Sequence, residues 1–321
     1  MLPGEAGINV RKTARYASKD CDPLHFGACR TAASDLPLYH LSTSMCPAHR
    51  LDILGEVKER LDRTPAICVS TQLIEAGVDI DFGSVIRALA GLDSIAQAAG
   101  RCNRHGKREM GRVHVINLAG ELPKALHDIR AAQEAAQRVL DENARTGEDR
   151  TVDLWNPKLT AEYFHYYFFD RRKEMDYPVN ADQAERDDNL LNMLAENTLA
   201  VAACPRPRSV YLRQAFMTAA EAFQAIDAST QGVVVPYAAE GKAIISELCS
   251  AHELEKQFSL LKRAQRFTVN VFPNVMEKLQ RVRAVYQAQE GTGILCLDEK
   301  YYSSHFGLNV EGTEEMELKD V

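Results

Sequence analysis

The stretch QAAGRCNRHG, residues 97–106, carries two arginines three positions apart, just after a glycine, in a segment that is otherwise small and apolar. Arginine is always charged, and its planar fork matches phosphate oxygens, so two of them can neutralise charge that develops on a transferring phosphoryl group. If the segment is helical, an amide, a bare backbone position and both guanidinium groups form one stripe, at Gln97, Gly100, Arg101 and Arg104. The alternative for an isolated pair of this kind is a solvated helix face.

Strand-forming and helix-forming segments alternate over residues 36–118 and must position this stretch. The apolar runs LPLYHLST, AICVST, SVIRALA and RVHVINL are separated by helical patterns in HRLDILGEVKERLD and DSIAQAAGRCNR, and AGINV is interpreted as an earlier strand stub. Such alternation predicts an α/β fold, a parallel sheet with helices on both faces. Asp93 or Ser94 is the expected N-cap of the helix that carries the arginines.

The segment STQLIEAGVDID begins where AICVST ends, and ligands of open parallel sheets bind at the carboxyl ends of strands. Gly77 lets the backbone come close to a partner. Asp79 and Asp81 follow, and a carboxylate there can accept a hydrogen bond from a ribose hydroxyl. The sequence therefore predicts a ligand site at this edge.

Composition places broad limits on function. The net charge of −7 argues against a simple nucleic-acid coat protein, but it leaves room for DNA in a local channel. No run of 18 apolar residues occurs and the N-terminus lacks a signal pattern, so a cytoplasmic protein without a membrane partner is expected. The eight scattered cysteines indicate reduced thiols. Cys21, His25 and Cys29 lack a fourth zinc ligand, and we expect no metal site.

Several segments together resemble a known family. VSTQLIEAGVDIDF followed by QAAGRCNR resembles motifs V and VI of superfamily 2 helicases, and GLDSIAQAAGRCNRHG is similar to their form in type I CRISPR-associated helicase–nucleases. YHLSTSMCPAHR resembles the motif IV region of that family. LTAEYFHYYF, QAFMTAAEAFQAIDASTQGVVVPY, LLKRAQRFTVNVF and YYSSHFGL resemble its linker helices and C-terminal domain, particularly in the type I-C branch. The likeness covers residues from about 37 to about 310.

The resemblance implies a domain arrangement. Residues 1–119 form a second RecA-like helicase lobe, of which the first 36 match poorly, so that the sheet is incomplete if they are not part of it. Residues 120–204 form a helical linker. Residues 205–321 form a smaller mixed α/β accessory domain.

The resemblance also implies site residues. Ser70, Thr71 and Gln72 contact single-stranded DNA or couple it to the ATP site, and His49 and Arg50 contact DNA from the motif IV region. Gly77 and Asp79 approach the nucleotide sugar. The catalytic set that reaches the β- and γ-phosphates, with Gly100 beside it, is Gln97, Arg101 and Arg104.

Parts of a complete motor are absent from this sequence. It contains no GxxxxGK[ST] phosphate loop and no DExD or DExH box. His127–Asp128 is the only adjacent His–Asp pair, and we interpret it as a solvated helix face, not as a nuclease metal site. ATP with Mg²⁺ is therefore expected to bind only at a site that a separate N-terminal lobe completes.

The function predicted from sequence is the C-terminal portion of an ATP-dependent single-stranded DNA helicase–nuclease of CRISPR antiviral defence, inactive by itself. Its expected partners are single-stranded DNA, the CRISPR RNA-guided surveillance complex and the N-terminal half. The alternative is a separately expressed non-catalytic module that binds DNA or the surveillance complex, or that complements the N-terminal half in trans. An unrelated α/β metabolic enzyme leaves the two adjacent helicase motifs unexplained.

Overall fold

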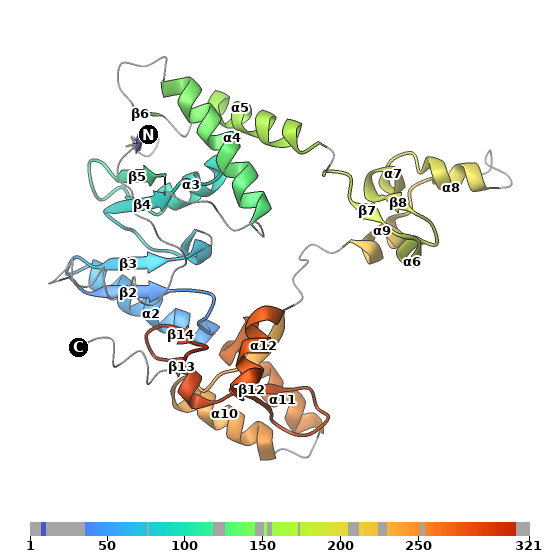
Figure 1. Cartoon of the computed structure of the whole chain (residues 1–321). Helices are drawn as coiled ribbons and strands as arrows, with labels where there is room; N and C mark the ends of the chain where they lie inside the picture. The colour runs from blue at the N-terminus through green and yellow to red at the C-terminus, as the bar shows by residue number, and fades with distance from the viewer. Residues whose placement is uncertain are drawn as a thin grey trace.

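The computed structural model describes residues 8–10, 36–75, 77–117, 126–144, 151–152, 156–172, 174–204, 212–223, 230–250 and 254–312. Three clusters of buried side chains occur within them. Figure 1 shows the helices and strands that carry these clusters. The Cys21–His25–Cys29 group lies outside the described residues. Within the described ranges, no helix combines the length and the hydrophobicity that crossing a bilayer requires.

The first sheet contains the strand that precedes the arginine segment. Its order is β4–β5–β1–β6, and the first three strands are parallel while β6 is antiparallel to β1. The strands are β4 (Ser84–Ala88), β5 (Arg112–Ile116), β1 (Ile8–Val10) and β6 (Thr151–Val152). The predicted strands in SVIRALA, RVHVINL and AGINV are therefore confirmed.

Three helices bury apolar side chains together with this sheet. Val113 and Val115 of β5 belong to one core with Ile95, Val139 and Tyr163. The helices are α3 (Leu92–Ala99), α4 (His127–Ala144) and α5 (Pro157–Asp170). Helix α5 begins where the Asn156 side chain accepts from the Lys158 amide at 3.0 Å, a usual N-cap arrangement.

Two further strands, β2 (Leu38–Leu41) and β3 (Ile67–Ser70), pair in parallel. The helix α2 (Pro47–Leu61) connects them. The sequence predicts one continuous sheet, whereas the described strands form a separate two-stranded sheet here. The chain after β3 turns away through η1 (Gln72–Ile74). Phe82 then pairs with the arginine segment, since its amide donates to Arg101 at 2.9 Å and its carbonyl accepts from Asn103 at 2.8 Å.

The C-terminal sheet has the order β10–β9–β12–β11. Its strands are β10 (Thr268–Val271), β9 (Gln231–Val234), β12 (Leu295–Leu297) and β11 (Val285–Gln287), and its helices are α10 (Ala238–Ser250), α11 (Leu254–Ala264) and α12 (Pro273–Arg281). Strands β9 and β10 lie in the segments GVVVPY and RFTVNVF, which the resemblance assigns to the linker helices and the C-terminal domain.

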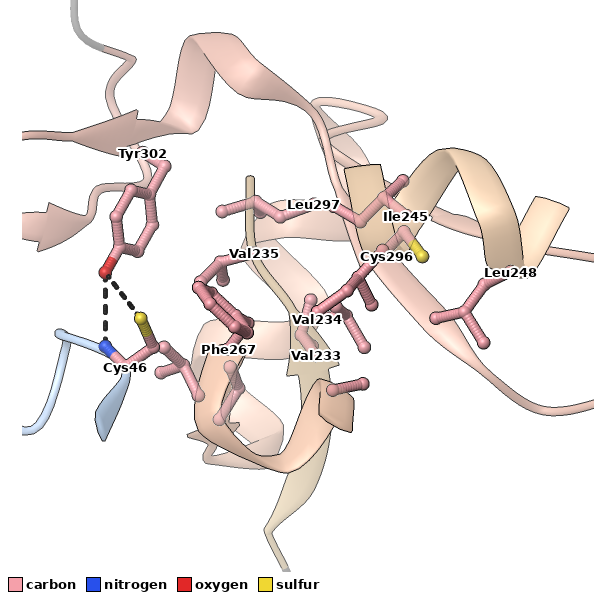
Figure 2. Close-up of a cluster of buried hydrophobic side chains, with 14 of the residues drawn as sticks. Cys46, Val233, Val234, Val235, Ile245, Leu248, Phe267, Cys296, Leu297 and Tyr302 are labelled. Carbon is pink, nitrogen blue, oxygen red and sulfur yellow. Dashed lines mark hydrogen bonds between the residues drawn. The ribbon is translucent and has the colours of Figure 1, made fainter. Parts of the chain in front are cut away.

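The start of α2 belongs to the C-terminal core. Cys46 and Ala48 are buried together with Val235, Phe267 and Leu297. Figure 2 shows Tyr302 reaching over to Cys46, whose amide donates to the Tyr302 hydroxyl at 3.1 Å. The hydroxyl in turn donates to the Cys46 sulfur at 3.4 Å. This contact ties the start of α2 to Tyr302 of the C-terminal part, 256 residues away in sequence.

A smaller helical unit lies between these parts of the sequence. Its core contains Val179, Met193 and Ala219. The elements are β7 (Pro178–Val179), α6 (Ala181–Ala184), β8 (Asp188–Asn189), α7 (Leu190–Leu194), α8 (Thr198–Ala203) and α9 (Phe216–Ala222). Short elements complete the C-terminal part: η3 (Gln265–Phe267), η4 (Glu299–Tyr301), β13 (Tyr302–Ser303) and β14 (Gly307–Leu308). The exact domain boundaries stay a prediction.

Candidate functional site

The predicted DNA-binding residues Ser70, Thr71 and Gln72 lie at the end of β3 and directly after it. Ser70 ends the strand, and its hydroxyl donates to the carbonyl of Thr71 at 2.8 Å. The Thr71 amide donates to the carbonyl of Leu41 at 3.2 Å, which ties this loop to the end of β2. Thr71 and Gln72 are exposed. The structure therefore brings the three residues together at the carboxyl edge of the β2–β3 pair.

The arginine segment does not form the helical stripe that its spacing predicts. Helix α3 ends at Ala99 with Gly100 as its C-cap, so both arginines lie beyond the helix. Asn103, with a φ of 50°, turns the chain further. The α-helical hydrogen bonds end here because the Asn103 amide donates to the carbonyl of Phe82, and the Arg101 carbonyl accepts from the Phe82 amide. As a result, Arg101 and Arg104 have different surroundings.

Arg101 is directed inward. The residue is only 8% exposed, and its Nε donates to the carbonyl of Ile74 at 2.9 Å while Nη2 donates to the carbonyl of Glu75 at 2.7 Å. Burial lowers the pKa of Arg101, and the nearby positive charge of Arg104 lowers it further. The guanidinium thus holds the turn at Ile74 and Glu75, which follows Ser70, Thr71 and Gln72 in the chain. Its predicted contact with phosphate stays a prediction.

A buried polar cluster lies beneath this turn. The carboxylate of Glu75 forms an ion pair with Arg87 Nε at 2.9 Å, and it accepts from the hydroxyl of Ser94 at 2.8 Å. Arg87 Nη2 also donates to Ser94 at 2.8 Å. The side chains of Arg87 and Glu75 are 20% and 9% exposed. This cluster connects β4, the start of α3 and the turn that Arg101 holds.

The N-cap of α3 is Gly91, not Asp93 or Ser94 as predicted. Both side chains bond elsewhere, since Ser94 contacts Glu75 and Asp93 accepts from the Tyr163 hydroxyl at 3.0 Å. A Cβ at Gly91 would lie 2.4 Å from the Tyr163 hydroxyl oxygen. A glycine therefore allows the close approach of α5 at this point.

Arg104 is directed outward and faces Asp79. Its Nε donates to Asp79 Oδ1 at 3.0 Å, and its backbone amide donates to Asp81 Oδ1 at 2.7 Å. The ring nitrogens of His105 lie 3.4 Å from Asp79 and 3.5 Å from Asp81, and Lys58 Nζ lies 3.8 Å from Asp79. The structure therefore brings the two predicted residues, Asp79 and Arg104, together within a charged network.

The electrostatics of this network favour an ionised Asp79. Desolvation pushes the pKa of Asp79 upward, but the positive charges of Lys58, His105 and Arg104 outweigh it and hold the pKa below its usual value. The side chains of Arg104 and Asp79 are 41% and 59% exposed. An exposed pair of this kind is held weakly enough for a stronger anion to displace the carboxylate.

The other predicted nucleotide-site residues are Gln97, Gly100 and Gly77, and their grouping with Arg104 and Asp79 stays a prediction. Gln97 is exposed on α3, and Gly100 caps that helix. Gly77 has a φ of 72°, and no atom lies within 4 Å of a Cβ built there. The glycine is therefore required by its left-handed backbone and not by a close neighbour in this structure.

His49 and Arg50 have unlike environments. His49 is 1% exposed, and its ring nitrogens lie 3.0 Å from the Tyr302 hydroxyl and 2.9 Å from the Ser304 carbonyl. Its ring stacks on Tyr237 with centroids 4.2 Å apart. These contacts dock α2 on the C-terminal core, so a DNA contact of His49 stays a prediction without support here. Arg50 is half-buried and lines a cavity beside α2.

His127 and Asp128 are exposed on α4, as expected for a solvated face. The structure adds Glu174, whose carboxylate lies within 4.8 Å of both. The Arg171 guanidinium contacts Asp128 at 2.5 Å and Glu174 at 2.7 Å. This arginine thus offsets the charge of the acidic pair, and the expectation of no metal there stays a prediction.

Sequence reasoning missed several residues of this site. Lys58, Glu75 and His105 carried no signal of their own, because charged residues are ordinary on exposed helices and loops. Arg87 did carry one, as the only charged residue in the apolar strand SVIRALA.

Comparison with known proteins extends these observations. Residues 23–107 match the family model described as "CRISPR-associated nuclease/helicase Cas3, C-terminal". The protein of that name from Haloferax volcanii is 42% identical over 92 residues, which are 27% of this chain and 10% of the relative. The one from Streptococcus thermophilus is 36% identical over 76 residues, 22% of this chain and 8% of the relative. The matched segments thus span a tenth or less of these relatives.

Solved structures show a shared fold over more of the chain. T. fusca Cas3–ADP is similar with a TM-score of 0.56 and 14% identity, over 96% of this chain and 41% of that chain. A chain of a structure described as "CRISPR RNA-guided surveillance complex, pre-nicking" is similar with a TM-score of 0.52 and 14% identity, over 92% of this chain and 41% of the other. Both likenesses support the predicted α/β fold.

Proposed function

The chain is related to the C-terminal part of the CRISPR-associated nuclease/helicase Cas3 family, and from this relationship we propose that it is one half of an ATP-dependent single-stranded DNA helicase. It would act in CRISPR antiviral defence in the cytoplasm. Assignment to the type I-C branch is part of the proposal.

The observation that carries the proposal is the exposed Arg104–Asp79 pair. Arg104 presents a charged fork at the edge of the molecule, and its present partner is one exposed carboxylate at 3.0 Å. A nucleotide phosphate carries more negative charge and can exchange for that carboxylate. Arg104 then acts on phosphate directly, while Arg101 keeps the turn at Ile74 and Glu75 in place.

The residues fit the outer side of a nucleotide site. Solved relatives include T. fusca Cas3–ATP and T. fusca Cas3–ADP. ATP with Mg²⁺ would supply the free energy for closing two lobes when bound. Arg104 and Gln97 would bind its phosphates, and Gly77 and Asp79 would lie by its sugar. The chain has no phosphate loop, so the phosphate cradle and the Mg²⁺ ligands would come from an N-terminal half.

The strand-binding side adjoins this site through the loop after β3. Ser70, Thr71 and Gln72 lie at the carboxyl edge, and the Arg101-bonded turn begins directly after them. A shift of this turn on nucleotide binding would therefore move the strand-binding residues. Single-stranded DNA would bind there through its backbone, without sequence preference and with strong salt dependence.

A second candidate function is a non-catalytic module that docks on an RNA-guided surveillance complex. The structural likeness to a chain of such a complex favours it. In that role, Arg104 would remain bonded to Asp79 and would bind no nucleotide. The loop after β3 would bind DNA or the complex.

The test is DNA-stimulated ATP hydrolysis by this chain, alone and mixed with the N-terminal half of a related helicase. Activity only in the mixture, lost with Arg104→Ala, supports the split motor. If the mixture does not hydrolyse ATP but the chain still binds DNA or the surveillance complex, the non-catalytic module is supported instead. Activity of the chain alone would contradict both candidates.

A further inference from the structure

A cavity of about 550 Å³ lies where α2 meets the C-terminal sheet, away from the Arg104 site. One wall comes from residues 43–50, between β2 and the first turn of α2. The other comes from residues 265–275, which form η3, β10 and the start of α12. The cavity therefore exists only while the two parts of the chain are docked through His49 and Tyr302.

The walls offer three kinds of group. Arg50 is the only charged residue that lines the cavity within the described chain, and no carboxylate lines it. Phe272 presents an aromatic ring that is 57% exposed. Gln265 and Asn270 supply side-chain amides, and Thr43 and Ser44 supply hydroxyls. The cavity thus has a positively charged lining, although the chain as a whole has a net charge of −7.

These polar groups are available for a ligand. Among the described residues, no hydrogen bond or ion pair engages the side chains of Arg50, Gln265 or Asn270. A cation, an uncovered aromatic ring and free amides are the groups that bind single-stranded nucleic acids, through the phosphate, the face of the base and its edge respectively.

The location connects the cavity to the strand-binding loop. Thr43 and Ser44 follow the carboxyl end of β2, and Thr71 follows the carboxyl end of the adjacent strand β3. The Thr71 amide bonds to Leu41, two residues before Thr43. Single-stranded DNA that lies along Ser70–Gln72 therefore reaches the cavity by continuing along the carboxyl edge of the β2–β3 pair.

We propose that this cavity is a binding site for one nucleotide of single-stranded DNA, with the base on Phe272 and the phosphate at Arg50. The inference rests on the proposed function for its substrate class. It adds that the C-terminal part contacts the strand itself through the Phe272 ring. It also explains why α2 is built into the C-terminal core, because the cavity needs both walls.

The test uses the complete chain and a fluorescent oligothymidylate, with affinity measured by fluorescence anisotropy. Loss of one base–aromatic stack predicts that Phe272→Ala weakens binding about 5- to 150-fold. Phe272→Leu, which keeps apolar bulk, should also weaken binding. Arg50→Gln should lower the magnitude of the slope of log affinity against log salt by about 0.7.

Matched controls are Phe258→Ala and Arg60→Gln. Phe258 is 71% exposed on α11, and Arg60 is exposed on the same helix as Arg50. Neither lines the cavity. Both variants should bind like the wild-type chain. A circular dichroism melt of each variant checks that it is folded.

A second measurement on the unmodified chain does not depend on variants. An oligonucleotide with 5-iododeoxyuridine is photo-crosslinked, and the adduct is located by mass spectrometry. An adduct within residues 265–275 supports the inference.

The inference is overturned if the Phe272 and Arg50 variants bind oligothymidylate with wild-type affinity and the crosslinked adducts lie outside residues 265–275. If Thr71→Val still weakens binding in that case, the proposed function survives alone. A wild-type chain that binds no oligothymidylate overturns both.

Discussion

The guanidinium of Arg104 lies 3.0 Å from the carboxylate of Asp79, at an exposed edge where His105 and Lys58 also surround that carboxylate. Arg101, three residues earlier, is instead buried against backbone carbonyls. The two arginines of one motif-like segment therefore have separate tasks. The guanidinium of Arg104 is exposed, whereas that of Arg101 maintains the turn that directly follows Ser70–Gln72.

Removing the charge of Asp79 should make Arg104 more available. In the complete helicase, Asp79→Asn keeps an oxygen for the ribose but loses the ion pair. Because an exposed ion pair is weak, its loss should let ATP bind only modestly tighter, up to about fivefold in an equilibrium titration. The control is Asp62→Asn, since Asp62 pairs with Lys107 at 3.7 Å outside the site. Weaker or unchanged ATP binding by the Asp79 variant would contradict this role.

The buried Glu75–Arg87 pair should couple strongly. Glu75→Gln leaves the Arg87 charge uncompensated, and the free energy of unfolding should fall by about 3 kcal/mol. The double variant Glu75→Gln/Arg87→Met should lose less free energy of unfolding than the sum of the losses in Glu75→Gln and Arg87→Met alone. Urea unfolding of the four proteins measures the coupling.

Exposed Glu142, which pairs with Arg138 at 3.2 Å, provides the control. Its replacement by Gln should cost about 0.5 kcal/mol or less. If the losses of unfolding free energy at Glu75 and Arg87 simply add, the two side chains do not stabilise each other as an ion pair.

Two glycines with left-handed backbone should differ in tolerance to alanine. At Gly77, with a φ of 72° and no atom within 4 Å of a Cβ, the cost should be about 1 kcal/mol of backbone strain. At Gly307, with a φ of 82°, a Cβ would lie 2.4 Å from the Ser44 carbonyl oxygen. The clash adds about 1–3 kcal/mol. Equal losses of unfolding free energy in Gly77→Ala and Gly307→Ala would argue against this backbone geometry.

His49 should make stability depend on pH. Desolvation lowers its pKa and so do the charges of His305 and His40, although the Ser304 carbonyl and Asp52 oppose the shift. The unfolded chain, with an ordinary histidine pKa of about 6.5, binds the proton first as pH falls. The stabilisation is thus full above that value and is lost as pH falls toward the folded pKa.

The variant His49→Asn should flatten this dependence between about pH 5 and pH 7. The pKa of His40 is also lowered by burial, so the comparison is the wild-type curve minus the variant curve, and His40→Asn serves as the parallel control. The urea midpoint at each pH is the readout. A difference curve that does not vary with pH would contradict a buried, neutral His49.

Much of the local structure follows from the sequence. Periodicity alone places α2, and the apolar runs place β3, β4 and β5, because each segment's pattern agrees with its packing. The α/β class and the relationship to Cas3 proteins follow in the same way, from segments that keep their spacing.

The remaining features depend on long-range contacts that local patterns do not encode. The end of α3 is set by pairing of residues 101–103 with Phe82, nineteen residues earlier than Arg101 in the chain. The inward position of Arg101 depends on free carbonyls at Ile74 and Glu75. The docking of His49 depends on Tyr302, 253 residues away.

The most direct test of the account is steady-state ATP hydrolysis, with single-stranded DNA present, by the complete helicase carrying Arg104→Ala. The kcat should fall about 10³-fold, while the unfolding temperature stays close to wild type because Arg104 is exposed. Arg101→Lys in parallel should lower the unfolding temperature, since a lysine cannot reach both carbonyls. Near-normal ATP hydrolysis by Arg104→Ala would contradict the assignment of Arg104 to the nucleotide phosphates.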